Sequence, residues 1–412
     1  MDRASFVMTM FLSYAAMAGD DGPAWDRSLP GADNAVLELA ASPDGRLVAT
    51  GRFQTIGGVA ADRVAAWDGA AWSPIGDGFN SAVGACAAFD DGSGETLFVG
   101  GGFTQSGSTL VSRVARFDGA AWTIAGAGFN QDVFTLAEVA GELYAGGSFT
   151  LSGSSPVRGV GRWTGSAWTN VGGGMVGAVH ALAEDPAGDL IAAGEFTFII
   201  GGPSVSNIAR WNGSQWFAMG SGLDGAVYAA AAGDLGAGET LFAGGDFTSN
   251  VAEWDGSSWT PLGGGPGGLV RDLLVADLGA GPVLLATGRF GPTGNGGLAA
   301  WDGSAWTILA GGLAATSAEA EGAALVIDPV SGGVAVGGSF TTAGGEPASN
   351  LALLAGAPAG NPADLSGDGV VGAADLALLI GSWGACGGCA ADLSGDGVVG
   401  TADLAALIGA WG

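Results

Sequence analysis

The sequence predicts a mainly β fold in which seven four-stranded units close into a ring, followed by a small helical domain. Three observations lead to this prediction: a repeat of about 47 residues, four short strand-like segments in each repeat, and a nearly duplicated stretch at the C-terminal end. Four strands per repeat at this period are typical of the blades of a β-propeller. We therefore expect a seven-bladed β-propeller with a small α-helical domain after it.

The repeat is marked by a Gly-x-Phe triplet. Its phenylalanines stand at positions 53, 103, 149, 196, 247, 290 and 340, at intervals of 50, 46, 47, 51, 43 and 50 residues. A second marker, Trp-(Asp/Asn/Thr)-Gly-x-x-Trp, begins at Trp67, Trp163, Trp211, Trp254 and Trp301, and Phe117 begins a variant of it. The Asp-Gly or Asn-Gly pair supplies a hairpin turn. The flanking aromatic rings can then pair across the two strands.

The third repeat illustrates how the strands are read. Branched and aromatic residues fill 133–140, 142–150, 157–163 and 167–173, and glycine separates these segments. The seventh repeat lacks a final strand of this kind, whereas the N-terminal segment 24–31, AWDRSLPG, matches one. We expect the N-terminal segment to complete the last blade, which removes an open sheet edge. The propeller would then span residues 22–356.

Composition narrows the classes of partner. The chain has 412 residues and a net charge of −28, from 40 acidic residues against 12 arginines and no lysine. A polyanion is repelled by nucleic acid and by anionic membrane surfaces, so we expect neither as a partner. Apolar residues make up 48% of the chain, enough to form a large core. We expect no transmembrane segment, because no apolar stretch is long enough to span a bilayer.

The first 18 residues are typical of a secretory signal peptide. Arg3 precedes a short apolar run from Phe6 to Ala15, and Ala16-Met17-Ala18 is an A-x-A cleavage site. The alternative is an N-terminus without such a function. We expect a secreted protein that is extracellular or held at the cell surface.

The duplicated stretch DLSGDGVVG begins at residues 364 and 392 and places oxygen-bearing residues at the spacing of a 12-residue calcium loop. Loop positions 1, 3, 5, 7 and 12 are Asp364, Ser366, Asp368, Val370 and Asp375 in the first copy, and Asp392, Ser394, Asp396, Val398 and Asp403 in the second. The valines would contribute backbone carbonyls, and an apolar helix follows each loop. We expect two calcium ions, with binding coupled to folding because these loops contain no basic residue. The alternative is a pair of Asx-rich turns without metal.

The repeat region and the C-terminal stretch each resemble a known family. The repeats resemble kelch-like propellers, particularly the W-D-G-x-x-W…GGxFT type of secreted bacterial proteins and Rax2-like fungal proteins, and this implies fold more than function. Residues 364–412, after a linker at 357–363, resemble a type I dockerin with paired EF-hand-like (F-hand) calcium loops. That resemblance implies docking onto a cohesin in a polysaccharide-degrading assembly.

The dockerin resemblance is incomplete at the positions that contact a cohesin. Ala373-Ala374 and Thr401-Ala402 stand where a Ser-Thr pair is usual, and the usual Lys-Arg pair is missing. Residues 364–412 are therefore expected to bind calcium, and to bind either a cohesin or another cell-surface module.

The three cysteines have two different expected roles. Cys386 and Cys389 lie between the two calcium loops, and in a secreted chain we expect them to form a local disulfide. Zinc would require four ligands, and a redox role would require a βαβ context. Cys86 is expected to be a buried free thiol.

Candidate ligand-binding residues were sought where the repeats differ from one another. A variable position in the first strand of each repeat holds Leu37, Gly84, Phe134, His180, Tyr228, Arg271 and Ala323. The middle residue of Gly-x-Phe is Arg52, Gly102, Ser148, Glu195, Asp246, Arg289 and Ser339. Counting along the hairpins places three polar pairs opposite each other near the ring axis: His180 and Glu195, Tyr228 and Asp246, Arg271 and Arg289. There a tyrosine can stack, carboxylates can accept hydroxyl hydrogens, and arginines can bind acids. The alternative is that these residues only seal the blade interfaces.

Two hypotheses for function remain. We favour a non-catalytic binding or interaction propeller, whose ligand would be a glycan or a protein. The alternative is a carbohydrate-active enzyme, a glycoside hydrolase or lyase, with Glu195 and Asp246 as the candidate carboxylates. The sequence leaves open whether the protein is an enzyme at all. Few polar residues depart from the repeat, which favours binding.

Overall fold

The structure is a computed structural model that describes residues 23–92, 94–279, 281–290, 297–315, 321–355, 373–385, 391, 393 and 398–409. The chain divides into two compact units. One comprises residues 25–276 and 282–354 and holds the β-sheets that follow the repeats. The C-terminal helices belong to the other unit, which comprises residues 1–24, 277–281 and 355–412.

Seven four-stranded antiparallel sheets are formed within the described residues, one for each repeat. The first three are β2 (Val36–Ala41), β3 (Leu47–Gly51), β6 (Val64–Trp67), β7 (Trp72–Pro74); β8 (Val83–Asp90), β9 (Glu95–Gly101), β12 (Val114–Phe117), β13 (Trp122–Ile124); and β14 (Val133–Val139), β15 (Glu142–Gly147), β18 (Val160–Trp163), β19 (Trp168–Asn170). The next three are β20 (Met175–Glu184), β21 (Leu190–Ile199), β22 (Ile208–Trp211), β23 (Trp216–Ala218); β24 (Ala226–Asp234), β25 (Glu239–Asp246), β26 (Val251–Trp254), β27 (Trp259–Pro261); and β28 (Gly268–Asp277), β29 (Pro282–Phe290), β30 (Leu298–Trp301), β31 (Trp306–Ile308). The last is β33 (Glu321–Ile327), β34 (Val334–Ser339), β37 (Leu351–Ala355), β1 (Ala24–Asp26).

Smaller sheets of two or three short strands accompany several of the main sheets. Most of their strands come between the second and third strands of a main sheet in the sequence. They are β4 (Thr55–Ile56) with β5 (Val59–Ala60), β10 (Gln105–Ser106) with β11 (Thr109–Leu110), β16 (Leu151–Ser152) with β17 (Ser155–Pro156), and β32 (Leu313–Ala314) with β35 (Thr342–Ala343) and β36 (Glu346–Pro347). The four sheet strands expected in the third repeat are all present, although each is shorter than the segment predicted for it.

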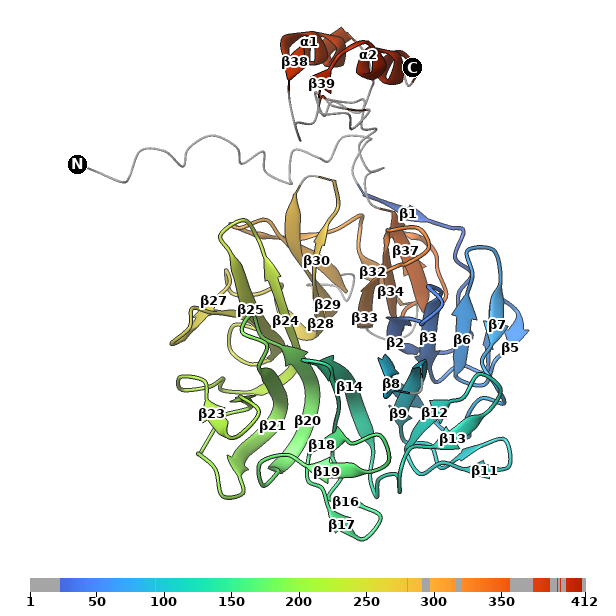
Figure 1. Ribbon diagram of the computed structural model, residues 1–412, viewed down its shortest axis with the longest axis vertical. Helices are drawn as coiled ribbons and strands as arrows, with labels where there is room; N and C mark the ends of the chain where they lie inside the picture. The colour runs from blue at the N-terminus through green and yellow to red at the C-terminus, as the bar shows by residue number, and fades with distance from the viewer. Residues whose placement is uncertain are drawn as a thin grey trace, which may run out of the picture. The chain divides into compact units, whose positions relative to one another are not determined.

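The sheets succeed one another around a common centre, as the colours from blue to orange show in Figure 1. Their first strands face this centre and pack against each other, and β33 and β34 of the last sheet pack against β2 of the first. Apolar side chains between neighbouring sheets form the core, with Phe53, Phe103 and Phe149 of the Gly-x-Phe triplets fully buried. The mainly β, propeller-like architecture expected from the repeats is therefore confirmed.

The aromatic hairpins form as expected from their turns. Trp67 pairs with Trp72 across the third and fourth strands, with ring centroids 5.5 Å apart. The equivalent pairs in the other hairpins have the same register, including Phe117 with Trp122. These cross-strand pairs fix the outer hairpin of each sheet.

The second tryptophan of each hairpin also joins its sheet to the preceding one. Trp122 donates its indole N–H to the carbonyl oxygen of Ile75, three residues after Trp72, at 2.8 Å. Corresponding bonds run from Trp168, Trp216 and Trp306 to carbonyls of the preceding sheet, and from Trp72 to Pro30. Among the described residues, Trp259 departs from this pattern, because its buried indole nitrogen has no acceptor.

The N-terminal segment joins the last sheet, as expected. β1 is the neighbour of β37 in the sheet order β1-β37-β34-β33. The backbone N–H of Ala32 donates to the carbonyl of Ser349 at 2.8 Å, and the side-chain amide of Asn350 donates to the carbonyl of Ala32 at 2.9 Å. Residues from the two ends of the repeat region therefore share one sheet.

In the C-terminal unit, α1 (Ala373–Gly381) and α2 (Thr401–Gly409) each follow one copy of the duplicated loop. Leu379, Val399 and Leu407 form a small core, and β38 (Gly384–Ala385) pairs with β39 (Val398–Val399). Two helices were expected here, from the apolar runs at 376–383 and 404–411, and each helix begins three residues before its run. Within the described part of the chain, no helix has the length and apolar character required to cross a membrane.

Several sequence predictions lie outside the described residues. These are the signal peptide at 1–18, the linker at 357–363, the disulfide between Cys386 and Cys389, and the metal ligands Asp364, Ser366, Asp368, Val370, Asp392, Ser394 and Asp396.

Candidate functional site: a central cavity

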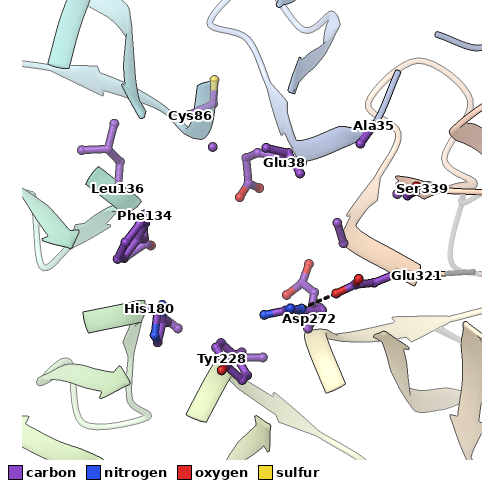
Figure 2. A pocket seen from close by; sticks show the side chains of 18 of the residues that line it. Ala35, Glu38, Cys86, Phe134, Leu136, His180, Tyr228, Asp272, Glu321 and Ser339 are labelled. Carbon is purple, nitrogen blue, oxygen red and sulfur yellow. Dashed lines mark hydrogen bonds and ion pairs between the residues drawn. The ribbon is translucent and has the colours of Figure 1, made fainter. Parts of the chain in front are cut away.

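A cavity of about 660 Å³ lies where the first strands of the sheets meet. It is lined by the variable first-strand residue of every repeat: Leu37, Gly84, Phe134, His180, Tyr228, Arg271 and Ala323. Figure 2 shows the labelled side chains of Phe134, His180 and Tyr228 on the side of the cavity opposite Glu38. The expectation that this sequence position lies near the axis is thus confirmed by its place in the structure.

A β-bulge at the same place in six sheets explains why this position lines the cavity. The strand register shifts between Val179 and Ala181, so that His180 is the extra residue of β20. Equivalent shifts occur around Leu37, Gly84, Phe134, Tyr228 and Ala323. A bulged residue has no partner across the ladder, and its side chain is re-aimed relative to a regular strand. Arg271 occupies the same position in the repeat and lines the same cavity.

Three aromatic rings from consecutive sheets pack into an arc around one side of the cavity. Phe134 stacks on His180 with ring centroids 5.1 Å apart and an interplanar angle of 26°. His180 contacts Tyr228 at 4.8 Å in a tilted arrangement. The imidazole of His180 therefore lies between two other rings, which restricts its orientation.

Arg271 extends this arc and links it to the last sheet. Its guanidinium lies over the ring of Tyr228, 4.6 Å from the centroid. Its Nε is 2.5 Å from Oε1 of Glu321 at the start of β33, which is the dashed line in Figure 2. The arginine charge is thus compensated by a carboxylate and a cation–π contact.

Glu195 receives two contacts from the arc. The hydroxyl of Tyr228 donates to its Oε1 at 3.0 Å, and Nε2 of His180 lies 3.3 Å from the same oxygen. The Nε2 atom of His180 is buried and forms no well-aligned hydrogen bond, so its contact with Glu195 is mainly electrostatic. Burial lowers the pKa of His180 in spite of the nearby carboxylate, so its imidazole is neutral at pH 7. Burial and the bond to Glu195 raise the pKa of Tyr228.

Only some of the middle residues of the Gly-x-Phe triplets line the cavity. Arg52 and Ser339 line it, whereas Glu195, Asp246 and Arg289 are exposed and lie outside its lining. The predicted strand register was wrong for two pairs: Glu195 lies opposite Ala178 rather than His180, and Asp246 lies opposite Ala226 rather than Tyr228. Each bulge accounts for one residue of this two-residue difference, because it adds one residue to the first strand. The turn accounts for the other residue, since Glu184 already pairs with Leu190, and Asp234 with Glu239, one position away from the predicted register. Arg271 contacts Tyr228 and Glu321.

Two carboxyl groups in the cavity were missed by the sequence analysis. Glu38 follows the bulged residue Leu37, Asp272 follows Arg271 at the equivalent position of its repeat, and both carboxyl groups line the cavity. Enclosure by the protein raises the pKa of Asp272 to about 7, although the two backbone N–H groups bonded to its carboxyl group act to lower this pKa. Enclosure also raises the pKa of Glu38 well above its ordinary value, and the charge of Asp272 raises it further. Carboxyl groups with pKa values shifted in this way are candidates for function.

A signal for these two residues exists in the sequence. The position after the bulge holds Glu38, Ala85, Thr135, Ala181, Ala229, Asp272 and Ala324. Only the first and sixth repeats place a charged residue there. Comparing two consecutive positions, rather than one, would have identified them.

Cys86 lies in the same wall as Glu38. It is a buried free cysteine, as expected from the sequence. Burial first, and then the charge of Glu38, raise the pKa of its thiol. The thiol is therefore protonated at neutral pH and poorly nucleophilic.

In the C-terminal unit, three of the predicted calcium ligands fall on described residues. Asp375 lies in α1 and Val398 in β39. Asp403 lies in the first turn of α2, is fully buried, and its Oδ2 accepts a hydrogen bond from the backbone N–H of Gly400 at 2.7 Å. Among the described residues, no three His, Cys, Asp or Glu side chains are grouped as a metal site would require, but most of the predicted ligands lie outside them.

No protein-family model and no curated protein sequence matches this chain. Solved structures do. The WD40 β-propeller domain of Doa1 matches with a TM-score of 0.50 at 14% identity, over 81% of this chain and 96% of that one. The extracellular domain of a protein from B. thetaiotaomicron, described as a one-component system, matches with a TM-score of 0.51 at 11% identity, over 80% of this chain. A second structure of that domain, described as part of a hybrid two-component system, gives 0.51 at 12%.

These likenesses establish the fold. The repeat region of this chain has a β-propeller fold, and identities this low carry no information about activity. The chain spans 40% of the length of the B. thetaiotaomicron domain that it matches.

Proposed function

We propose that this protein is a secreted, non-catalytic binding protein: a closed seven-bladed propeller that holds a small polar ligand in its central cavity and carries a calcium-binding, dockerin-like module. The seven blades correspond to the seven four-stranded sheets, of which the last contacts the first. One observation carries the binding function. The first-strand residues that differ between repeats converge on one cavity, whereas the residues that repeat form hairpins and core.

The size and lining of the cavity support a small-molecule ligand. Its volume of about 660 Å³ falls in the range of ligand pockets, roughly 300–1,000 Å³. Aromatic rings and the carboxyl groups of Glu38 and Asp272 line the same cavity and combine apolar surface with hydrogen-bond acceptors. A purely structural seal of the blade interfaces would not require two carboxyl groups in the cavity wall, where enclosure makes their ionisation costly.

A panel of small solutes tests this proposal. At Gly84 an added Cβ would meet no atom within 4 Å, so that Gly84→Trp can fill part of the cavity without displacing the wall. We expect at least one sugar, amino acid, amine or dicarboxylate to raise the melting temperature of the wild type and not that of Gly84→Trp. Leu110→Trp, at a position that is 67% exposed, is the matched control. Equal stabilisation of all three proteins, or of none by any solute, would contradict the proposal.

The C-terminal module is proposed to bind two calcium ions. Asp403 supports this: it stands at position 12 of the second loop, and its buried carboxylate is directed back to the loop residue Gly400, whose N–H it accepts. The other ligands would be those of the two loops predicted from the sequence. Bound calcium would neutralise the carboxylates and hold each loop against its helix. Cys386 and Cys389 are proposed to form a disulfide between the loops, which intact-mass measurement before and after reduction tests.

A partner for the module follows from the dockerin resemblance. We propose that residues 364–412 attach the propeller to a cohesin or to another cell-surface module, within a polysaccharide-handling assembly. The full chain is immobilised and exposed to secreted and envelope fractions with calcium or with EDTA. Calcium-dependent capture of a cohesin-bearing protein is expected. Retention that is the same in EDTA would contradict this role.

Glycoside hydrolysis remains the second candidate, favoured by one observation. Glu38 and Asp272 are carboxyl groups in one cavity, and the charge of Asp272 raises the pKa of Glu38. Hydrolysis of a glycosidic bond uses two such groups, one protonated and one ionised. The pair first considered, Glu195 and Asp246, lies outside the cavity lining. Release of reducing sugar from a polysaccharide by the wild type, abolished in Glu38→Gln and Asp272→Asn, would establish this activity in place of simple binding.

A further inference from the structure

We propose that the central cavity is selective for an organic cation, whose ammonium group binds between Glu38 and Asp272 while its apolar part lies against Phe134, His180 and Tyr228. This inference rests on the proposed binding function of the cavity and names the chemical class of its ligand. It is carried by the position of the two carboxyl groups, their partners, and the charges around them.

The backbone holds Asp272 in a fixed orientation. Its Oδ1 accepts the N–H of Leu273 and its Oδ2 accepts the N–H of Leu325, both at 2.8 Å. Leu325 belongs to β33, so the carboxyl group spans from the sixth sheet to the seventh. Each oxygen retains a further lone pair that can accept from a ligand.

Glu38 is held more loosely. Its Oε1 accepts the N–H of Leu39 at 3.2 Å, and in the described part of the chain no donor is bonded to its Oε2. The first and sixth sheets are separated only by the seventh, whose side chains at this level are absent or small: Gly322, Ala323 and Ala324. The two carboxyl groups can therefore act on one ligand group, and Figure 2 shows both pointing into the cavity.

In the part of the chain that the structure describes, no arginine, Arg52 included, forms an ion pair with Glu38 or Asp272. Arg271 is adjacent to Asp272 in the sequence, but its charge is directed to Glu321 at 2.5 Å and to the ring of Tyr228. The effects that lower the pKa values of Glu38 and Asp272 are backbone hydrogen bonds alone. Two enclosed carboxyl groups without a countercharge are costly to ionise, and they are complementary to a cation.

The aromatic rings that line the same cavity suit the organic part of such a ligand. Phe134, His180 and Tyr228 offer ring surface and edges, and an organic cation near aromatic rings is stabilised by their electron density. The net charge of −28 concentrates cations near the protein and disfavours anionic ligands. An ammonium group also matches two carboxylates better than calcium does, because calcium takes six to eight oxygen ligands.

Binding of a cation would release protons from this pair. Enclosure raises the pKa of both carboxyl groups, and an ammonium binds their ionised form, so affinity rises with pH until both are ionised. Other titratable or charged groups line the same cavity: Arg52 directly after β3, Cys86 on β8, His180 on β20, Tyr228 on β24, Arg271 on β28 and Glu321 on β33. Of these, His180 is neutral and Arg271 is paired with Glu321, so neither reverses the direction of the effect.

Three probes of equal length and different charge test the inference on the full-length chain: cadaverine, 1,5-pentanediol and glutarate. Isothermal titration at pH 8 is expected to show binding of cadaverine to the wild type and none of the diol or the diacid at the same concentration. Glu38→Gln should weaken cadaverine binding by about tenfold, since one charge-assisted hydrogen bond is lost. Affinity in the wild type should fall between pH 8 and pH 5.

The variants are chosen so that folding does not decide the result. Glu38→Gln is neutral, as the protonated glutamic acid is, and only one backbone N–H contacts the native carboxyl group. Glu239→Gln changes an exposed carboxylate at the start of β25, outside the cavity lining, and is expected to leave cadaverine binding unchanged. Melting temperatures of both variants check that they are folded.

The outcomes separate this inference from the function on which it rests. Binding of the diol or of sugars, lost in Gly84→Trp, with no preference for cadaverine, would overturn the cation inference and leave the binding function intact. Cadaverine binding that Glu38→Gln does not weaken would also overturn it. Absence of any ligand that distinguishes the wild type from Gly84→Trp would contradict both.

Discussion

The indole N–H of Trp25 donates a hydrogen bond to the carbonyl oxygen of Ala310, 2.8 Å away and 285 residues later in the chain. Trp72 makes a bond of the same kind to Pro30 at 2.9 Å. The two junctions that involve the N-terminal segment are thus built like the junctions between successive sheets. This equivalence indicates that the segment is an integral part of the last sheet.

Removing the indole N–H of Trp25, and with it the bond to Ala310, should lower the free energy of unfolding. Trp25→Phe keeps an aromatic ring and loses the N–H, so we expect a loss of about 1 kcal/mol in the free energy of unfolding. Trp259→Phe is the matched control, because the indole nitrogen of Trp259 is buried without an acceptor among the described residues. It should cost less than Trp25→Phe in urea titrations. An equal cost for both would contradict the role of the bond.

The enclosed carboxyl groups predict an unusual dependence of stability on pH. The pKa of Asp272 is raised to about 7, so the folded protein holds this proton between pH 4 and pH 7 while the unfolded chain has lost it. The free energy of unfolding therefore falls as pH rises through this range, and Glu38 contributes in the same direction. Asp272→Asn should reduce the fall between pH 5 and pH 8 by about 1–2 kcal/mol. Urea titrations at both values test this, and an unchanged fall would argue against enclosure.

The contact of Arg271 with Glu321 predicts energetic coupling between the two residues. Arg271→Met leaves the carboxylate without its partner and removes the contact with Tyr228. Since both side chains are partly exposed, a double-mutant cycle with Glu321→Gln should give a coupling of about 1 kcal/mol. A coupling close to zero would mean that the pair does not order this part of the cavity wall.

The C-terminal module predicts a calcium-dependent transition in the full chain. EDTA should lower the melting temperature of one unfolding step, and titration of the calcium-free protein should show two bound ions per chain. Asp403→Asn should reduce the number of ions to one, because it removes a ligand of the second loop alone. Two ions in this variant, or an EDTA-insensitive melting profile, would contradict the proposed site.

Much of the propeller could be predicted from local patterns. Each Trp-Asp-Gly-x-x-Trp stretch contains its own turn and its own aromatic pair, so its hairpin depends on neighbouring residues only. The N-terminal strand could also be placed, because a ring of repeats lacks one strand without it.

The β-bulges could not be predicted in the same way. A bulge is a property of two paired strands, and nothing in the residues around His180 distinguishes it from a regular strand residue. The prediction consequently identified the residues of the arc but assigned wrong partners to His180 and Tyr228. Glu38 and Asp272 were missed because their enclosure results from seven strands converging, which no single repeat reveals.

The most direct test of the central claim is a calorimetric titration of the solute that most stabilises the wild type, performed on the wild type and on Gly84→Trp. The account predicts one site per chain in the wild type and no detectable binding to Gly84→Trp, whose new side chain occupies the cavity. Unchanged affinity in Gly84→Trp would show that the ligand binds elsewhere, and the central cavity would then lose its assignment as the binding site.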